Sequence, residues 1–363
     1  MPQKNSDTNM VISKESADIL HGRLASAHHP VIVSHMKPDG DAMGSCIALY
    51  HCIGMYGSAS AKIIINDRYP DYLGFLAAEV PDSDMIVHAQ LPLEAETAIK
   101  DSDLVICLDF NAFHRADRLE AALTESKADK ILIDHHLNPA REAFDLVFSE
   151  TDISSASELL YHILMETVKI GHDASMLPPA AARALMTGMT TDTNNFANST
   201  YPSTFRMASA LLATGVDRDE ILSRLYNQYG ENRLRVLGHM MKDLLTITED
   251  GVAYMVLDKA TLRHYNVGEG DTEGFVNMPL SIAEVRMSFL IKEDDDRVRV
   301  SIRSKKGTSA NTCARIYFNG GGHENAAGGR LNIPEDISGI SEAAGYIEEK
   351  THEYFTKENG NKN

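Results

Sequence analysis

The chain has 363 residues, which is too long for one ordinary hydrophobic core and therefore predicts two domains. A hydrophobic content of 43% and a charged content of 24% are typical of a soluble globular protein, and no apolar segment is long enough to cross a bilayer. The net charge of −18 argues against a broad electrostatic grip on long DNA or RNA, but it still admits small phosphorylated substrates.

The N-terminal segment and the cysteines both favour a cytoplasmic protein. The first twenty residues are polar and mixed in charge, so they predict no secretory signal peptide. The cysteines, Cys46, Cys52, Cys107 and Cys313, lack the spacing of a metal knuckle, and the first three fall in segments that we expect to be core. We therefore expect reduced thiols and a cytoplasmic location.

In the first half of the chain, apolar runs alternate with stretches of helical periodicity. The runs at 31–35, 62–66, 104–109 and 131–134 are short and rich in β-branched residues, as buried parallel strands are. This alternation predicts an α/β fold built on a doubly wound, mainly parallel sheet.

Helices are expected between these strands and after them. Apolar residues after Asp41 recur at helical spacing, so a helix begins there. The Ser155-x-x-Glu158 pattern of a capping box precedes an apolar run and predicts a second helix start. Residues 180–189 predict a further helix that places Asp192 at its end.

The second half of the chain changes character. Residues 203–246 have a helical pattern throughout, and strand patterns resume at 252–257, 285–291 and 297–303. We therefore divide the chain into an α/β domain over 1–205, a helical connector over 206–244, a smaller α+β domain over 245–355 and a frayed tail over 356–363.

Acidic and imidazole side chains recur at the edges of the expected strands and helices. Open α/β sheets bind ligands beyond the carboxyl ends of their strands, so groups far apart in the sequence are expected to converge. A single Asp at such a position is usually a helix cap or a turn residue, but recurrence at several independent edges favours a shared site. The residues concerned are His35, Asp39, Asp41, Asp109, His135 and Asp192.

This donor set predicts a metal site that cleaves phosphate esters. Carboxylates and imidazoles without a thiolate suit Mn²⁺ best among common metals, with Mg²⁺ or Co²⁺ as alternatives. The four carboxylates carry a charge of −4 that would repel phosphate, and two divalent ions would cancel it. Two ions about 3.5–4 Å apart can share a hydroxide nucleophile and stabilise in-line displacement at phosphorus.

Several motifs, in this order along the chain, resemble the DHH phosphoesterase superfamily. They are H-x-x-P-D-G-D-x-x-G-S at 35–45, Asp109 after its strand, D-H-H at 134–136, T-D-T at 191–193 and G-G-G-H-E-N-A-A-G-G at 320–329, the last being similar to the DHH-associated C-terminal domain. The resemblance covers most of the chain. Its plain two-domain plan looks most like the bacterial nanoRNase and adenosine 3′,5′-bisphosphate (pAp) phosphatase branch.

The resemblance implies a role for each matching residue. It implies one ion on His35 and Asp39, the other ion on Asp41, His135 and Asp192, and Asp109 as the bridge between them. The implied catalytic residues are Asp109, Asp134 and His136. Asp134 would lie behind the site, and a carboxylate there can hold an imidazole in place. His136 would lie near the reacting phosphate as an orienting group or proton donor, with structural support as the alternative role.

The C-terminal domain is expected to bind the substrate. In the strand over 297–303, Arg297 and Arg299 are interpreted as a solvated face. Arg303 and Ser304 belong to a segment that resembles the substrate-contacting Ser-Leu-Arg-Ser of the family, and a planar guanidinium suits a phosphate or a base.

The glycine-rich segment is the second candidate for substrate binding. Gly320, Gly321 and Gly322 permit close backbone approach and would leave amides free to cradle an anion, and His323 can bond a phosphate or stack on a base. Two positions depart from the family pattern. Asn194 stands where relatives often have glycine after T-D-T, and Asn319 precedes the glycine run. Either one can alter specificity without touching the metal ligands.

We therefore expect a Mn²⁺-dependent phosphoric ester hydrolase that acts on RNA oligomers of a few nucleotides and on pAp, with linear pApA or cyclic di-AMP as further substrates. The alternatives are an inorganic pyrophosphatase or exopolyphosphatase, a RecJ-like single-strand exonuclease and a non-catalytic nucleotide sensor. The glycine-rich segment argues against the pyrophosphatase, and the charge of −18 argues against the exonuclease. Expected partners are short single-stranded RNA and nucleoside bisphosphates, not membranes or long duplexes, and the sequence leaves homodimer formation open.

Overall fold

The structure is a computed structural model that describes residues 12–57, 61–227, 230–268, 270–294 and 297–360. The chain divides into two compact units, Met1–Gln228 and Tyr229–Asn363, and each contains its own hydrophobic core. Within the described residues, every helix is too short or too polar to cross a lipid bilayer.

Unit 1 is built on a six-stranded sheet in which all neighbouring strands are parallel. The strands are β1 Pro30–Val33, β2 Lys62–Ile65, β3 Met85–Val87, β4 Leu104–Leu108, β5 Asp129–Asp134 and β6 Leu146–Ser149. Their order is β3-β2-β1-β4-β5-β6, so the winding of the chain reverses between β1 and β4. This confirms the doubly wound parallel sheet that the sequence predicts.

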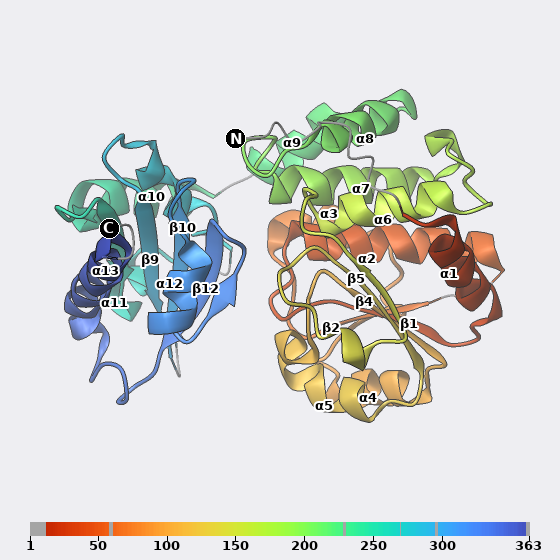
Figure 1. Ribbon diagram of the computed structural model, residues 1–363, viewed down its shortest axis with the longest axis horizontal. Helices are drawn as coiled ribbons and strands as arrows, with labels where there is room; N and C mark the ends of the chain where they lie inside the picture. The colour runs from red at the N-terminus through yellow and green to blue at the C-terminus, as the bar shows by residue number, and fades with distance from the viewer. Residues whose placement is uncertain (1–11, 58–60, 228–229, 269, 295–296, 361–363) are drawn as a thin grey trace. The chain divides into compact units, whose positions relative to one another are not determined.

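Helices cover both faces of this sheet. The helices of unit 1 are α1 Lys14–Ser26, α2 Gly40–Ile53, α3 Gly74–Ala77, α4 Pro92–Asp101, α5 Glu120–Glu125, α6 Ala156–Glu166, α7 Pro179–Asp192, α8 Pro202–Ala213 and α9 Arg218–Tyr226. Figure 1 shows α1, α2, α6 and α7 on one face and α4 and α5 on the other. Ile32 of β1 packs in the core on the α2 side, whereas Val31 and Val33 pack with Ile99 of α4. Because both faces are covered, the strands are unbroken apolar runs.

Two glycines allow α2 and α7 to pack at very short range. A Cβ atom on Gly44 of α2 would lie 2.7 Å from the carbonyl oxygen of Ala184, and a Cβ atom on Gly188 of α7 would lie 2.9 Å from a carboxylate oxygen of Asp41. Both approaches are closer than a side chain tolerates. The two glycines therefore set the distance between the helix that begins near Asp41 and the helix that ends at Asp192.

Unit 2 contains a mixed six-stranded sheet with the order β11-β12-β10-β9-β8-β7, in which β8 and β9 are parallel and the other neighbours are antiparallel. Its elements are β7 Thr246–Ile247, β8 Val252–Leu257, β9 Met287–Glu293, β10 Val298–Ser304, β11 Gly321–Gly322, β12 Ala326–Leu331, α10 Glu231–His239, α11 Lys259–His264, α12 Ala310–Tyr317 and α13 Ala343–Gly360. α12 and α13 pack on one face of the sheet, and α10 packs on the other. The smaller α+β fold is therefore confirmed.

Two segments differ in detail from the expectations. Residues 206–244 are helical for most of their length, but α8 and α9 belong to unit 1 whereas α10 belongs to unit 2. The segment 356–363, which we expected to be frayed, is helical as far as Gly360, and 361–363 lie outside the described residues. Since α13 packs its apolar side against the sheet of unit 2, this helix is ordered by tertiary contacts that a polar tail sequence does not reveal.

The start of α6 and the cysteines were also predicted. The Ser155 hydroxyl caps α6 by accepting the Glu158 amide at 2.9 Å, as expected. The reciprocal half of the capping box is absent, because the Glu158 carboxylate bonds Ser154 and Thr204 instead of the Ser155 amide. The four cysteines are buried free thiols, as expected.

Candidate metal centre

The candidate site lies at the carboxyl edge of the unit 1 sheet. β1 and β4 are the neighbouring strands between which the winding reverses, and open α/β sheets bind ligands in the crevice at that point. His35 lies two residues after β1, Asp109 follows β4 directly, and His135 follows β5 directly. Helices α2 and α7 supply further carboxylates at the same edge.

Two groups of candidate ligand atoms share Asp109. One ligand atom each from His35, Asp39 and Asp109 lies within 4.8 Å of the others, and the same holds for Asp41, Asp109 and His135. Asp109 Oδ2 lies 3.4 Å from His35 Nε2, and Asp109 Oδ1 lies 3.4 Å from His135 Nε2. The two oxygens of one carboxylate therefore face two different imidazoles.

Asp39 and Asp192 add carboxylates at the rim of the site. Asp39 Oδ1 lies 3.9 Å from His35 Nε2, and Asp192 Oδ2 lies 3.6 Å from His135 Nε2. The Asp39 and Asp192 side chains are 45% and 27% exposed, whereas that of Asp109 is 3% exposed. The cluster is therefore open to solvent at these two side chains and closed behind Asp109.

Asp109 has two features that fit a carboxylate completed by a cation. Its backbone φ is 64°, in the left-handed region, which costs about 1–2 kcal/mol for a residue with a Cβ atom. Its buried Oδ1 atom has no hydrogen-bond partner among the described residues. Buried polar atoms are normally bonded, and strained backbone collects at functional sites. The chemistry of the donor set and this orphaned oxygen therefore fit a divalent metal.

Burial and neighbouring charges shift the pKa values of the cluster strongly. Burial lowers the pKa of His35 and of His135, but the Asp109 carboxylate and its acidic neighbours outweigh this effect and raise them to about 9 and about 10. Burial opposes ionisation of Asp109, yet the two imidazoles hold its pKa well below the usual range. Burial and the Asp109 charge raise the pKa of Asp41 and bring that of Asp192 to about 6. The metal-free cluster therefore holds protons that a bound cation would displace.

Asp41 is fixed by the N-terminus of α6. Its Oδ2 atom accepts the Ala156 amide at 2.6 Å, and its Oδ1 atom accepts the Ser157 amide at 2.9 Å. Backbone amides at a helix N-terminus stabilise negative charge. No local sequence pattern indicates this role of Ala156 and Ser157, because they lie 115 and 116 residues from Asp41.

The structure shows Asp39 as a helix cap, and its role as a metal ligand stays a prediction. Asp39 is the N-cap of α2, and its Oδ1 atom accepts the amides of Asp41 and Ala42 at 3.0 and 3.1 Å. A carboxylate has a second oxygen, so capping and metal binding are compatible. Asp192 is the last residue of α7, where the helix dipole disfavours a negative charge that a cation would offset.

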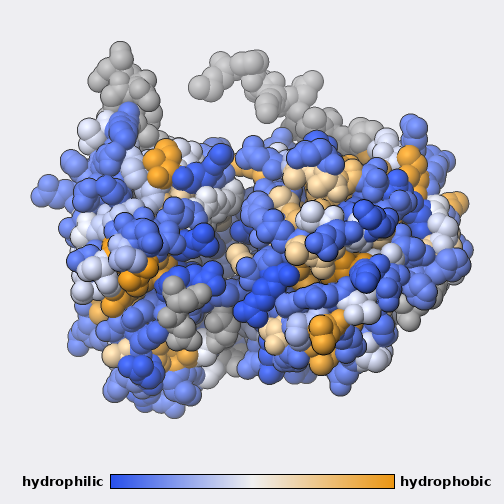
Figure 2. Space-filling view, turned by 90° about the horizontal axis from the view of Figure 1, so that it is seen from below, coloured by the Kyte–Doolittle hydropathy of each residue, from blue (hydrophilic) through white to orange (hydrophobic). Residues whose placement is uncertain are grey.

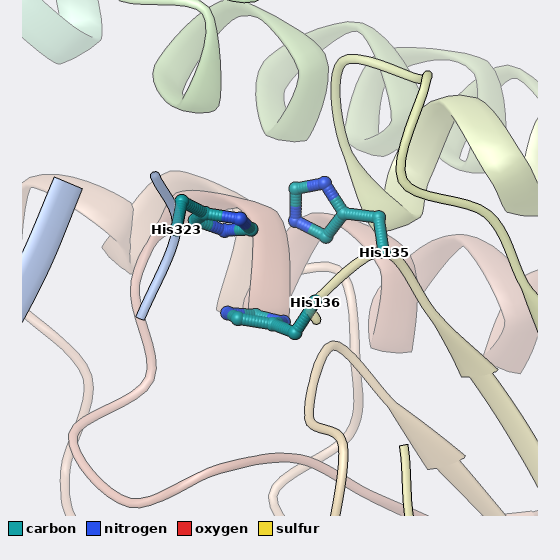
Figure 3. Close-up of side chains that lie close together, drawn as sticks. All are labelled: His135, His136 and His323. Atoms are coloured by element: carbon teal, nitrogen blue, oxygen red, sulfur yellow. The ribbon is translucent and has the colours of Figure 1, made fainter. Parts of the chain in front are cut away.

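His136 is held by both carboxylate oxygens of Asp134. His136 Nδ1 lies 2.7 Å from Asp134 Oδ1, and the His136 amide donates to Asp134 Oδ2 at 3.1 Å. Asp134 is fully buried behind the ring. Figure 3 shows the rings of His135 and His136 extending from the end of β5. The planes of the two rings are inclined by 72°. The Asp134 contact therefore orients His136 so that Nε2 is directed away from Asp134.

Arg115, which no sequence pattern singles out, brings positive charge to this acidic cluster. It lies in the short helix Phe113–Leu119 after β4, and its carbonyl oxygen accepts the Met36 amide at 2.8 Å, next to His35. Burial and, more weakly, the Arg115 charge lower the pKa of His35 against the carboxylates that raise it. Within the described part of the chain, Arg115 is in no ion pair. A half-buried cation in this position suits an incoming anion.

In unit 2, Arg303 and Ser304 are bonded to the protein in different ways. Arg303 Nη1 donates to the carbonyl oxygen of the preceding residue at 2.9 Å and to that of Ala327 at 3.4 Å. The buried Ser304 hydroxyl donates to the Thr308 carbonyl at 2.7 Å and accepts from Asn325 Nδ2 at 2.9 Å. Ser304 therefore holds the turn after β10, and its contact with substrate stays a prediction, as does that of Arg303.

The glycine run is an edge strand and not an open loop. Gly321–Gly322 is β11, which pairs with β12, and the Gly320 amide already donates to the Ala314 carbonyl at 3.2 Å. A Cβ atom on Gly320 would lie only 1.9 Å from the Gly328 carbonyl oxygen. The close backbone approach that we expected is therefore made within the protein, and the Gly320 amide is not free. The turn between β11 and β12 begins at His323. Anion binding by this segment stays a prediction.

The two departures from the family pattern have the same physical basis. Asn194 has a backbone φ of 46° and Asn319 has a φ of 48°. Asn enters the left-handed region more readily than other side chains with a Cβ atom, so it can replace glycine there. At Asn194 the departure therefore keeps a backbone conformation that glycine also adopts.

Models of two protein families match the chain. The DHH family N-terminal domain matches residues 30–189, which include every expected metal ligand except Asp192, and the DHHA1 domain matches residues 236–349. An exopolyphosphatase-related protein of known structure from Bacteroides fragilis is 33% identical, with a TM-score of 0.85, and the match covers 95% of this chain and 97% of that one. The chain belongs to the DHH phosphoesterase family.

Named members of the family include nucleases and phosphatases. The bifunctional oligoribonuclease and PAP phosphatase NrnA of Bacillus subtilis is 27% identical over 313 residues, which are 85% of this chain and 91% of the relative. The cyclic-di-AMP phosphodiesterase GdpP of Geobacillus thermodenitrificans is 28% identical over 342 residues, which are 92% of this chain and 48% of the relative. The match to the first relative therefore covers nearly the whole length of that protein.

Proposed function

We propose that this protein hydrolyses phosphate esters in RNA oligomers of a few nucleotides and in pAp, with two Mn²⁺ ions, and that linear pApA and cyclic di-AMP are further substrates. The observation that carries this proposal is Asp109, whose two carboxylate oxygens face His35 and His135 in two groups of candidate ligands. The names of the B. subtilis and G. thermodenitrificans relatives support the choice of substrates.

The ligands of the two ions would be the residues predicted from the sequence, which are His35, Asp39, Asp41, Asp109, His135 and Asp192. Mn²⁺ suits them because the donors are carboxylates and imidazoles without a thiolate. When bound, the ions would cancel the negative charge of the cluster and supply Lewis-acid activation of water and of the phosphoryl group.

The residues around the ligands would position the substrate and move a proton. Arg115 would attract a phosphate oxygen into the acidic cluster. Asp134 holds His136 Nδ1, so His136 Nε2 would be the atom that donates a proton to the leaving oxygen. In other sites too, a buried carboxylate orients an imidazole.

Unit 2 would supply nucleotide recognition. The Arg303 guanidinium is braced by two backbone carbonyls, so it would meet a phosphate or a base with little loss of side-chain freedom. His323 would add a hydrogen bond or a stacking surface. We also infer a cytoplasmic location, where the four buried cysteines stay reduced.

A substrate panel tests the proposal. The protein is incubated with Mn²⁺ and pAp, di- to pentanucleotides, pApA, cyclic di-AMP, pyrophosphate or polyphosphate, and the products are separated by chromatography. We expect turnover of pAp and of the short oligomers, and loss of turnover after chelation. Faster turnover of pyrophosphate or polyphosphate than of any nucleotide would identify the alternative activity instead. Tight nucleotide binding without turnover would identify a sensor.

A further inference from the structure

We propose that Phe205 and Phe196 form a stacking platform, on unit 1 beside the metal centre, for a nucleobase of an oligonucleotide substrate. This inference rests on the proposed function and adds a binding subsite to it. Because pAp has a single base, we expect that pAp does not place a base on this platform.

The two rings are stacked, and one of the two side chains is largely exposed to solvent. Their centroids are 5.2 Å apart and their planes are inclined by only 7°. Phe196 is partly buried against the core of unit 1, whereas Phe205 is 58% exposed. Every nucleobase has a π face, so an exposed aromatic ring of this kind can stack a base of any sequence.

Phe196 is tied to the metal centre by the turn after Asp192. The Phe196 amide donates to Thr193 Oγ1 at 3.0 Å, and the Asn198 amide donates to the Thr193 carbonyl at 2.9 Å. Phe196 itself has a φ of 67°, which is unusual for a bulky residue. Four peptide units separate Asp192 from Phe196, so their Cα atoms are at most about 14 Å apart. An oligomer of a few nucleotides spans that distance.

Phe205 is tied to the centre by a second and independent route. Its neighbour Thr204 donates to the Glu158 carboxylate at 2.7 Å. Glu158 lies in the first turn of α6, whose leading amides hold the Asp41 carboxylate. The first turn of α8 and the ligand Asp41 are thus anchored to the same turn of α6, so the platform and the metal ligands are placed by one rigid element.

Arg218 gives the platform a charge that suits a nucleotide. Its guanidinium carbon lies 5.5 Å from the centroid of the Phe196 ring, and its Nη2 atom donates to Asn195 Oδ1. In a protein with a net charge of −18, a cation fixed beside a stacked aromatic pair, of which Phe205 is exposed, favours a polyanion with bases over an acidic or purely apolar partner. The alternative occupant of this surface is a second copy of the chain, and the oligomeric state of the variants distinguishes it from an oligonucleotide.

The test compares Phe205→Ala with Phe205→Trp and with Leu212→Ala. Leu212 lies seven residues further along α8 and is 45% exposed, so it matches Phe205 in helix and exposure without an aromatic ring. Michaelis constants are measured for pAp and for a pentanucleotide. We expect Phe205→Ala to raise the KM of the pentanucleotide about 5- to 20-fold, which is the lower part of the stacking range, and to leave that of pAp within about twofold. Phe205→Trp should restore the wild-type KM, and Leu212→Ala should change neither.

Two further measurements make the outcome decisive. Fluorescence anisotropy with a labelled pentanucleotide gives the affinity even if the wild-type protein proves to hydrolyse no oligomer, which would be a failure of the proposed function alone. Size-exclusion chromatography of the same variants gives the oligomeric state. An equal effect on pAp and pentanucleotide, an unchanged pentanucleotide affinity, or a change of oligomeric state in Phe205→Ala would overturn the platform.

Discussion

The carboxylate of Asp109 faces His35 with one oxygen and His135 with the other, so a single substitution removes a donor from both groups of ligands. We expect Asp109→Ala to bind less than one Mn²⁺ per chain and to lose activity by more than about 100-fold, because loss of even an outer partner of a metal ligand costs roughly 10- to 100-fold. Metal content after dialysis and hydrolysis of pAp are the measurements. Asp82→Ala, an exposed carboxylate before β3, is the control. Two bound ions and more than a few per cent of activity in Asp109→Ala would contradict the bridging role.

Arg115 is expected to act on the substrate and not on the metals. Arg115→Ala should raise the KM for pAp about 10-fold, the value of one charge-assisted hydrogen bond, while the metal content stays at the wild-type level. Arg115→Lys should recover part of the loss, because it keeps the charge but not the planar fork. Arg118→Ala is a matched control, since this exposed side chain lies in the same short helix. Equal KM values for Arg115→Ala and Arg118→Ala would remove Arg115 from the site.

Arg303 of unit 2, like Arg115, is expected to contact the substrate. We expect Arg303→Ala to raise the KM for nucleotide substrates about 10-fold and to leave metal content unchanged, because every candidate metal ligand from the sequence lies in unit 1. Arg299 is the control on the same strand, since it already pairs with Asp294 at 2.7 Å. Steady-state kinetics and metal analysis of both variants decide the matter, and an unchanged KM in Arg303→Ala speaks against a substrate contact.

At the scale of single residues, the sequence predicted side chains better than it predicted backbone partners. His35 and Asp109 were identifiable because buried parallel strands end abruptly in polar residues, and that boundary is visible locally. The amides of Ala156 and Ser157 were not identifiable, because any residue type supplies an amide. Arg115 was missed for a related reason, since its proximity to His35 arises from a backbone contact between the segment after β1 and the short helix after β4.

At the scale of elements, the close packing of α2 and α7 places two of the carboxylates. We expect Gly44→Ala to push α2 away from the Ala184 carbonyl and to destabilise the protein by about 1–3 kcal/mol, as overpacking generally does. Because α2 carries Asp41 and α7 carries Asp192, the shift should also lower metal affinity. Chemical denaturation and Mn²⁺ titration measure both effects.

Gly22 of α1 provides the opposite control. A Cβ atom there would meet nothing within 4 Å, so Gly22→Ala should stabilise the protein by roughly 0.5–1 kcal/mol through helix propensity and leave Mn²⁺ affinity unchanged. If Gly44→Ala behaved like Gly22→Ala, the spacing of α2 and α7 would not matter to the centre.

The elements themselves were largely predictable, and their pairings were not. Period and composition predicted the longer central strands of both sheets and the helix that ends at Asp192, because these elements are regular and strongly apolar, whereas β3, β6, β7, β11 and β12 were not predicted. The pairing of the glycine run at 320–322, which we expected to leave its amides free, was not predictable, because a two-residue edge strand has no periodicity and its pairing with β12 depends on distant residues. The division of residues 206–244 between the two units was also not predictable, because it too depends on contacts with distant residues.

At the scale of the whole molecule, the protons held by the metal-free centre link its stability to pH. The pKa values of His35 and His135 are raised from 6.5 to about 9 and about 10, and that of Asp192 is raised from 3.8 to about 6. A group whose pKa is raised by folding stabilises the folded state fully below its unfolded pKa and loses this contribution as the pH rises through the folded pKa. All three groups therefore contribute a stabilisation that decreases as the pH rises, and the metal-free protein should become less stable from pH 5.5 to pH 8.5.

Bound Mn²⁺ should reverse this fall of stability with rising pH. The ion takes the place of the protons on the cluster, so it binds more tightly at a pH where these protons have been lost. At a Mn²⁺ concentration about 100-fold above Kd, binding contributes about 2.7 kcal/mol, which corresponds to a rise in Tm of roughly 5–10 °C for a domain of this size. Differential scanning calorimetry at pH 5.5, 7 and 8.5, with Mn²⁺ or with a chelator, measures the difference. Since each unit has its own core and the candidate ligands from the sequence lie in unit 1, we expect only the transition of unit 1 to move, and in Asp109→Ala we expect it not to move. A Mn²⁺-induced shift that shrinks as the pH rises would mean that the ion binds elsewhere than at these imidazoles and carboxylates.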